Sequence, residues 1–327
     1  MLQTPSRIAS IVAWTCLAGI LGITAIALVS SRWGWPLYFE LLSHFQGQYW
    51  ALSCVGLGAI VLTRRARPAL VALACVVALT AQLWPWYWPP HFLTGGDRGS
   101  FRVLLANVQT QNRNFDAVRQ WAQDEAPDLA LFVEVDDRWV EQLNPLLATL
   151  PYFAGQTSDD NFGIVIYSRY ALENVELVNF HPDSRLSVTA TLRIHDQPLS
   201  LVGTHPLPPN NLPYFRSRNR QLDRMGRYLQ SLEGAKLVLG DLNITMWSPY
   251  YQRLMRQTGL KNARDGFGLL PTWPTGKLHP LLPRWVTRWW VIPIDHGLVS
   301  PDLTVTDMRV GPDVGSDHRP IVIDLRW

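Results

Sequence analysis

Two stretches near the C-terminus carry most of the information about this chain, Gly240-Asp241-Leu242-Asn243 and Gly315-Ser316-Asp317-His318-Arg319-Pro320. Each places an acid beside a second polar group at the end of an apolar run that is typical of a strand, residues 236–239 before the first and 321–323 after the second. Carboxylate, carboxamide and imidazole groups at strand ends can hold a hard divalent cation and activate water. The two stretches therefore predict a hydrolytic site, provided that the fold brings them together.

The charge of the chain is distributed unevenly. Of the 29 basic and 26 acidic residues, residues 1–96 hold five arginines and one acid, Glu40, so the rest of the chain has a formal charge of −1. The C-terminal part thus has no general attraction to polyanions such as nucleic acids. The three cysteines, Cys16, Cys54 and Cys75, also lie in the N-terminal third. This excludes a disulfide, a thiolate nucleophile and a cysteine zinc site from the C-terminal part.

The N-terminal third, residues 1–93, is predicted to be a membrane region of about three transmembrane helices, at 8–30, 46–63 and 68–88. Crossing a bilayer takes about 20 residues, and none of the three segments shows the polar face of a surface helix. The third ends in Trp84-Pro85-Trp86-Tyr87-Trp88, and Trp and Tyr are favoured at the membrane–water boundary. Two helices and a hairpin are the alternative. The first apolar segment is longer than that of a cleaved signal peptide.

The arginines predict the orientation in the membrane. Arg7 precedes the first helix, and Arg64, Arg65 and Arg67 lie between the second and the third. The positive-inside rule places these arginines in the cytoplasm. Three crossings then place the rest of the chain outside it. We therefore expect a multi-pass protein of the cell inner membrane whose catalytic domain is periplasmic, with the lipid bilayer as its partner and no protein partner predicted.

Residues 94–100 have the composition of a flexible linker, and 101–327 are predicted to form a separate domain. Short β-rich runs alternate there with helical patterns. Many strands with interspersed helices indicate a layered α/β domain with helices packed outside sheets. Strands are expected at 101–106, 129–133, 163–167, 186–194, 199–203, 237–240, 296–299 and 321–325, and helices at 115–125, 214–232 and 249–258.

Polar side chains stand where these expected strands stop. Taken alone, each has an ordinary reading as a turn, cap or loop residue. Together they are harder to dismiss, since groups on rigid strand ends that converge on one edge form a preorganised site. They are Asn107, Glu134, His205, Asp241 with Asn243, Asp295, and Asp317 with His318.

Two other kinds of hydrolase fit the sequence poorly. There is no Gly-x-Ser-x-Gly elbow for a nucleophilic serine, and Ser316 lacks the strand–turn–helix context. The histidines do not form His-Glu-x-x-His or a similar close pair for zinc. Oxygen ligands from Glu and Asp suit Mg²⁺ better, with Mn²⁺ as a second candidate.

The motifs resemble those of the endonuclease/exonuclease/phosphatase superfamily, which includes DNase I-like nucleases, abasic-site endonucleases, inositol polyphosphate 5-phosphatases and sphingomyelinases. The resemblance covers roughly residues 100–327, and its motifs come in the family's order. It implies a two-sheet, four-layer α/β sandwich of the DNase I-like kind, with the site at one edge. It is carried by Asn107, Phe132-Val133-Glu134, residues 163–169, Gly203-Thr204-His205, Gly240-Asp241-Leu242-Asn243, Ile294-Asp295-His296 and Ser316-Asp317-His318-Arg319-Pro320.

The resemblance also implies roles for these residues. Glu134 would be the main Mg²⁺ ligand, supported by Asn107 and Asp317. The other five would be catalytic. Asp241 and Asn243 would orient or activate the attacking water, His205 would donate to a phosphate oxygen, and Asp295 would fix the tautomer of His318 beside the scissile phosphate. Whether His318 is the base or an electrostatic partner stays open. Some family nucleases carry a second acid where this chain has Gln109, which makes a second metal site doubtful.

Three further residues are expected to bind substrate. Relatives often show an Arg and a Gln after the His205-type loop, which suggests Arg218 and Gln221. Guanidinium groups match phosphate bidentately, although a solvated arginine face is the alternative reading of this helix. Trp273, in Pro271-Thr272-Trp273-Pro274, would stack on a base or a head group or plug the sandwich. The following segment, 277–290, is rich in Pro, Trp and Arg and is expected to be an elaborated loop.

The sequence thus predicts a membrane-anchored, Mg²⁺-dependent phosphoesterase. Its substrate would be a phosphate ester, foremost a phosphodiester, in a nucleic acid or a lipid head group. One alternative is a phospholipid- or sphingomyelin-type phosphodiesterase that acts on membrane lipids, which would explain the anchor. The other is a non-catalytic phosphate-binding domain, which is weakened because every catalytic position holds a competent residue.

Overall fold

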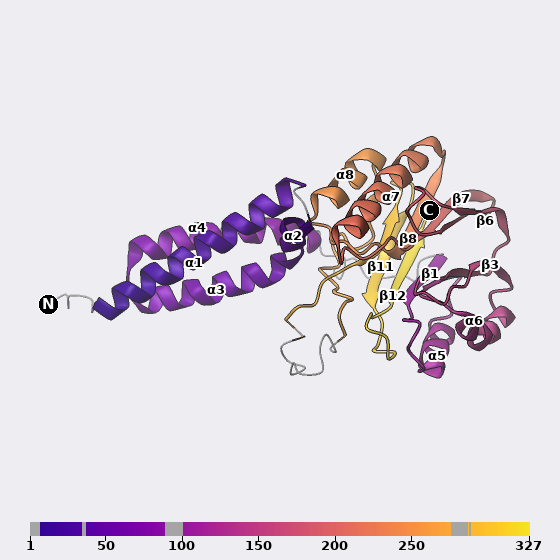
Figure 1. The fold of residues 1–327 in the computed structure, drawn as a ribbon, viewed down its shortest axis with the longest axis horizontal. Helices are drawn as coiled ribbons and strands as arrows, with labels where there is room; N and C mark the ends of the chain where they lie inside the picture. The colour runs from indigo at the N-terminus through magenta and orange to yellow at the C-terminus, as the bar shows by residue number, and fades with distance from the viewer. Residues whose placement is uncertain (1–6, 35–36, 89–100, 276–286, 288) are drawn as a thin grey trace.

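The computed structural model describes residues 7–34, 37–88, 101–275, 287 and 289–327. The predicted linker 94–100 and most of the segment 277–290 lie outside the described residues. The molecule is elongated, with a bundle of helices at its N-terminal end and a layered α/β domain at the other (Figure 1).

The N-terminal bundle contains three helices that are long and apolar enough to cross a membrane, over Arg7–Arg32, Leu37–Leu62 and Ala66–Trp86. They pack against one another along a small apolar core that includes Leu17 and Ile60. Their outer faces expose large apolar side chains such as Leu62, which suits a lipid environment. The elements are α1 (Arg7–Arg32), α2 (Leu37–Leu41), η1 (Leu42–Phe45), α3 (Gln46–Leu62), α4 (Ala66–Leu83) and η2 (Trp84–Trp86).

The C-terminal domain contains two six-stranded sheets. The first has the order β11-β12-β1-β2-β4-β3 and the second β5-β6-β7-β8-β10-β9. In the first sheet the strands are β1 (Phe101–Asn107), β2 (Leu129–Val133), β3 (Tyr152–Gln156), β4 (Ile164–Ser168), β11 (Thr304–Val310) and β12 (Ile321–Arg326). In the second they are β5 (Leu172–Val178), β6 (Ser187–Ile194), β7 (Gln197–Thr204), β8 (Ala235–Asp241), β9 (Lys261–Asn262) and β10 (Asp295–Val299).

The sheets face each other across one apolar core, and helices cover their outer faces. Leu131 of β2 and Leu239 of β8 belong to the core between the sheets. Trp139 lies in the core between the first sheet and its helices. Met225 lies in the core between the second sheet and its helices. This is the predicted four-layer α/β sandwich, with the two pairs of helices on opposite sides (Figure 1). The covering helices are α5 (Phe115–Glu125), α6 (Asp137–Leu143) with η4 (Asn144–Ala148), α7 (Leu212–Ser231) and α8 (Pro249–Thr258).

The glycine of the Gly240-Asp241 pair is required by the packing of two neighbouring strands. A Cβ atom added to Gly240 would stand 1.8 Å from the carbonyl oxygen of Thr204. No side chain fits in that space, so β7 and β8 can approach closely only with glycine there. This approach brings His205, directly after β7, beside Asp241 at the end of β8.

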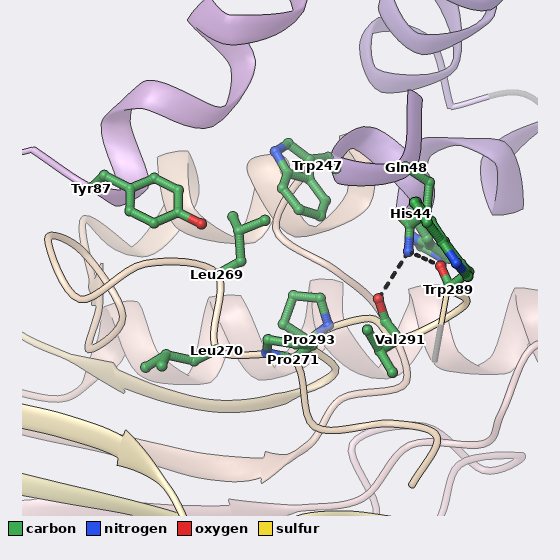
Figure 2. Close-up of a pocket in the computed structure, with 11 residues that line it drawn as sticks. His44, Gln48, Tyr87, Trp247, Leu269, Leu270, Pro271, Trp289, Val291 and Pro293 are labelled. Atoms are coloured by element: carbon green, nitrogen blue, oxygen red, sulfur yellow. Dashed lines mark hydrogen bonds between the residues drawn. The ribbon is translucent and has the colours of Figure 1, made fainter. Parts of the chain in front are cut away.

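The helical bundle and the sandwich are in direct contact. Leu83 at the end of α4 belongs to the apolar core that α7 and α8 form with the second sheet. Trp247 donates its indole N–H to the carbonyl of Gln82 at 3.2 Å. Gln48 donates to the carbonyl oxygens of Trp289 and Val291 at 2.7 and 3.0 Å (Figure 2). The two parts therefore share a core and hydrogen bonds.

Candidate active site

The predicted polar residues gather where strands of both sheets end at one edge. Parallel neighbours β1 and β2 bring Asn107 beside Val133, the residue before Glu134. Antiparallel β8 and β10 place Asp241 directly opposite Asp295. The loop that leads into β12 then adds Asp317 and His318. The strand register therefore explains why residues so far apart in the sequence meet.

The carboxylate of Asp241 is the centre of this group. Its Oδ2 atom lies 3.5 Å from Nε2 of His205 and 3.5 Å from Nε2 of His318, and it accepts a hydrogen bond from Asn107 Nδ2 at 3.1 Å. Oδ1 accepts the backbone N–H of Asn243 at 2.9 Å. Burial raises the pKa of Asp241, but the two imidazoles and the Asn243 N–H outweigh it and lower the pKa to about 2. The carboxylate thus stays ionised at neutral pH.

His318 is held between two carboxylates. Its Nδ1 atom lies 2.9 Å from Oδ2 of Asp295, so Nδ1 carries a proton and Nε2 faces Asp241. Burial lowers the pKa of His318, but the charges of Asp295 and Asp241 outweigh burial and raise it to about 10. The imidazole is therefore positively charged at neutral pH, and it can donate from both nitrogens.

His205 lies on the other side of Asp241. Burial lowers its pKa, while the contact with Asp241 and the charge of Glu134 raise it, and the net direction is upward. Its Nδ1 atom has no hydrogen-bond partner among the described residues. The ring of Phe162 lies 5.4 Å from the His205 ring between centroids and is tilted by 37° to it, and the guanidinium of Arg185 lies 4.0 Å above Phe162.

Glu134 and Asn107 form the group best suited to a hard cation. Asn107 Nδ2 donates to Glu134 Oε1 at 2.9 Å, so one amide bridges the half-buried carboxylate of Glu134 and the buried one of Asp241. Burial raises the pKa of Glu134, and the charge of Asp317 adds to this rise against the lowering effects of His205 and His318. A desolvated carboxylate with the second carboxylate of Asp317 nearby favours binding a divalent cation. These residues therefore fit Mg²⁺.

A second arrangement of possible ligands is less suited to a metal ion. Among the described residues, Asp241, Asp295 and His318 bring three ligand atoms within 4.8 Å of one another. The hydrogen bond between His318 and Asp295 and the raised pKa of the imidazole favour a proton at that place. Mg²⁺ also prefers oxygen to imidazole nitrogen.

Trp273 is joined to the site through Asp317. Its indole Nε1 donates to Asp317 Oδ2 at 3.1 Å, and its ring lies 6.4 Å from the ring of His318. The side chain is half-buried, so it can both fix Asp317 and present an aromatic edge. Ser316 fixes the loop that contains Asp317 and His318. Its hydroxyl donates to the carbonyl of Asn107 at 2.7 Å and accepts the backbone N–H of His318.

Arg218 and Gln221 lie in places that differ from the expected substrate contacts. Both are fully buried, so neither has surface with which to touch a substrate. Arg218 donates to the carbonyl of Asn243 at 2.8 Å, and Gln221 donates to the hydroxyl of Thr204 at 3.0 Å. These hydrogen bonds fix the residues next to Asp241 and His205 from the side of α7, within the buried interior of the domain. The sequence shows an arginine-rich helix, but it does not show which face of that helix is covered.

The more exposed cation near the site is Arg185, which sequence reasoning missed. Together with Phe162 and Ser158 it lines a cavity of about 230 Å³, and Phe162 joins this cavity to His205. Arg185 also pairs with Asp160 at 3.1 Å. Arg185 follows a turn and belongs to none of the sequence motifs, so the sequence alone does not distinguish it from other arginines.

The structure is a two-sheet α/β sandwich whose acidic and imidazole groups meet at one edge. Residues 104–318 match the Endonuclease/Exonuclease/phosphatase family, and the chain belongs to that family. The family acts on phosphate esters by hydrolysis. None of the curated protein sequences matches this chain.

Solved structures share the fold at low sequence identity. D. rerio TDP2 complexed with a single-strand DNA product has a TM-score of 0.59 at 16% identity, over 69% of this chain and 99% of that one. An endonuclease/exonuclease/phosphatase of Beutenbergia cavernae has a TM-score of 0.52 at 19% identity, over 71% and 72%. Beta toxin of Staphylococcus aureus has a TM-score of 0.52 at 15% identity, over 68% and 99%.

Proposed function

We propose that this protein is a membrane-anchored, Mg²⁺-dependent phosphoesterase that hydrolyses phosphodiesters by attack of water. The observation that carries the proposal is the ionised carboxylate of Asp241, held 3.5 Å from two imidazoles and bridged by Asn107 to Glu134. Phosphoryl transfer needs a positioned nucleophile and positive charge around the phosphate oxygens. This arrangement offers both, and family membership supports hydrolysis of phosphate esters.

In the proposed mechanism, Glu134, Asn107 and Asp317 would hold Mg²⁺, and the ion would supply positive charge against the charge of the phosphate. Asp241 orients the attacking water through its carboxylate, which its low pKa keeps ionised at neutral pH. Asn243 fixes the Asp241 carboxylate through its backbone N–H. His318, charged by its contact with Asp295, and His205 donate hydrogen bonds to phosphate oxygens. The raised pKa of His318 therefore favours an electrostatic role over that of general base.

We further propose that residues 1–93 anchor the enzyme in the cell inner membrane and that the domain 101–327 works on the periplasmic side. Three apolar helices of spanning length support the anchor. The arginines at 7, 64, 65 and 67 support the orientation, because the positive-inside rule keeps them in the cytoplasm. An alkaline phosphatase fusion to the C-terminus should be active. An inactive fusion, paired with a fluorescent GFP fusion, would reverse the orientation.

Two substrate classes fit this proposal. A nucleic acid is supported by the fold likeness to D. rerio TDP2, which was solved with a single-strand DNA product. The net charge of −1 on residues 97–327 gives no broad basic surface for it. We therefore assign the general class, phosphodiesters, and leave the choice to experiment.

A membrane lipid is the second candidate, favoured by the surface where the domain meets the helices. Trp289 and Trp290 are half-exposed there and, with Phe45, Tyr49 and Leu52, line an apolar cavity of about 480 Å³. A second cavity of about 350 Å³ lies next to it, between the helices and the sandwich (Figure 2). Exposed tryptophans beside membrane helices are typical of the lipid–water boundary, so lipid head groups would lie near this face.

The test uses the full chain in detergent micelles with four substrates, bis-p-nitrophenyl phosphate, plasmid DNA, abasic DNA and phospholipid vesicles. Each is assayed with Mg²⁺, with Mn²⁺ and with EDTA. Asp241→Asn keeps the size of the side chain and removes its charge, and Asp302→Asn, at an exposed turn, is the matched control. We expect hydrolysis that requires metal and Asp241 but not Asp302. Metal-independent hydrolysis, or full activity of Asp241→Asn, would refute the mechanism.

A further inference from the structure

A buried ion pair connects the membrane region to the active site. Glu40 lies in α2, the short helix at the junction between the bundle and the sandwich (Figure 1). Its Oε1 atom is 3.2 Å from Nη2 of Arg218, and neither side chain has exposed surface. The hydroxyl of Ser248 donates to the same Glu40 oxygen at 2.5 Å. Among the residues that the structure describes, Glu40 is the one carboxylate within ion-pair distance of Arg218.

Arg218 also contacts the loop that follows β8 and contains Asn243. Its Nη1 atom donates to the carbonyl oxygen of Asn243 at 2.8 Å. Asn243 has a φ of 51°, a left-handed conformation that a non-glycine residue keeps only when its surroundings hold it. The same residue donates its backbone N–H to Asp241. Three contacts in series therefore lead from Glu40 to the carboxylate at the centre of the site.

A second contact from the membrane region holds the same loop further along. Nδ1 of His44, in η1, lies 2.9 Å from the hydroxyl of Thr245. With Ser248 on Glu40, the segment 40–44 contacts the loop after β8 at Thr245 and Ser248 and, through Arg218, at Asn243. Removal of one partner leaves a buried charge without compensation, which is strongly unfavourable. Glu40 thus supplies the charge that compensates Arg218, whose Nε and Nη2 atoms also donate to Oδ1 of Asn219.

We propose that Glu40 is a positioning residue of the active site, so that the membrane region completes the catalytic centre as well as anchoring it. Glu40 keeps Arg218 on the carbonyl of Asn243, and this fixes the loop from which Asp241 acts. The inference rests on the proposed hydrolytic function for its effect on rate, but not for its effect on the loop. It also assigns the buried Arg218 a role that direct contact with substrate does not explain.

The experiment compares Glu40→Gln with Asp324→Asn in the full chain in detergent micelles. Asp324 is the matched control, because this buried carboxylate forms an ion pair at 2.6 Å with the half-buried Arg102 in the other sheet, away from the site. With bis-p-nitrophenyl phosphate and Mg²⁺, we expect Glu40→Gln to lower kcat about 10- to 100-fold at a KM within about threefold of wild type. Asp324→Asn should lower the Tm without lowering kcat.

Hydrogen exchange gives a second readout that does not depend on activity. Amide exchange in the peptide 241–248 should become faster in Glu40→Gln and stay as in wild type in Asp324→Asn. If the wild type hydrolyses no phosphate ester, the proposed function fails while this readout still tests the contact. Unchanged exchange at 241–248, or wild-type kcat in Glu40→Gln, would overturn the proposal.

A double variant covers the case in which Glu40→Gln does not fold. Glu40→Met with Arg218→Met removes both charges and leaves no unpaired buried ion. Its Asn243 carbonyl lacks the Arg218 donor, so we expect a folded protein with reduced kcat and faster exchange at 241–248. A folded double variant with wild-type kcat and wild-type exchange would show that the pair is structural only.

Discussion

Replacing Asp295 by Asn tests the charge state of His318. The two side chains share a hydrogen bond of 2.9 Å, and both are almost completely buried. Asparagine has the same size but no charge, so it removes the largest influence that raises the pKa of His318. Burial then lowers the pKa of the imidazole, with Asp241 left to oppose it. The variant should hold a neutral His318 at a pH where the wild type holds a charged one.

The size of the effect follows from the hydrogen bond that is lost. A hydrogen bond to a charged group contributes about 1.5–3 kcal/mol, which corresponds to about 10- to 150-fold in rate at about 1.4 kcal/mol for each factor of ten. We therefore expect kcat of Asp295→Asn to fall within this range at neutral pH. The amide can also present its NH₂ group to Nδ1 and select the wrong tautomer, which would add to the loss.

The assay is initial-rate hydrolysis of bis-p-nitrophenyl phosphate by the full chain between pH 5 and pH 11. The pKa of His318 is raised to about 10, so wild-type activity should fall as the pH rises through about 10. In Asp295→Asn this alkaline decline should begin at a lower pH. Asp302→Asn should behave as wild type. If Asp295→Asn keeps its activity within twofold, or keeps the alkaline decline in place, the role assigned to a charged His318 is wrong.

Three further changes test separate parts of the structure. Glu134→Gln should lower the Mg²⁺-dependent rate by about 100-fold or more, because it removes the one carboxylate assigned as main ligand. Calorimetric titration with Mg²⁺ should show weaker binding, and unchanged binding would contradict the assignment. Trp273→Phe removes the donor to Asp317 Oδ2 and should lower kcat/KM about tenfold, while an unchanged value would make the tryptophan a packing residue. Leu131→Ala, in the core between the sheets, should lower the free energy of unfolding by about 2–5 kcal/mol and leave kcat of the folded protein unchanged, as thermal melting and rate measurements would show.

The central strands of both sheets could be predicted from the sequence, and the edge strands could not. The expected strand 129–133 and the helices 115–125 and 249–258 agree with β2, α5 and α8. The four missed strands, β3, β5, β9 and β11, are the outermost ones of the two sheets. An edge strand has one neighbour and is largely exposed, as in β5, so it lacks the continuous apolar run that marks a buried strand.

The strand-end residues of the candidate site could be predicted from the sequence, but their contacts could not. Strand ends locate Asn107, Asp241 and Asp295 because a strand stops where its apolar run stops. The partners of Arg218 cannot be read in this way. A helix rich in arginine looks solvated until another part of the chain covers one of its faces, and here that part is α2 with Glu40.

The α/β class of the fold, three apolar helices of spanning length and the residue types of the candidate site could be predicted from the sequence, because apolar periodicity and strand-end chemistry are local properties of the chain. The remaining contacts depend on tertiary packing. That packing placed Asp241 between His205 and His318, buried Arg218 behind Asn243, and brought Glu40 of α2 within ion-pair distance of Arg218. These contacts join segments far apart in the chain, and only the packing of the two sheets and the helical bundle sets their distances.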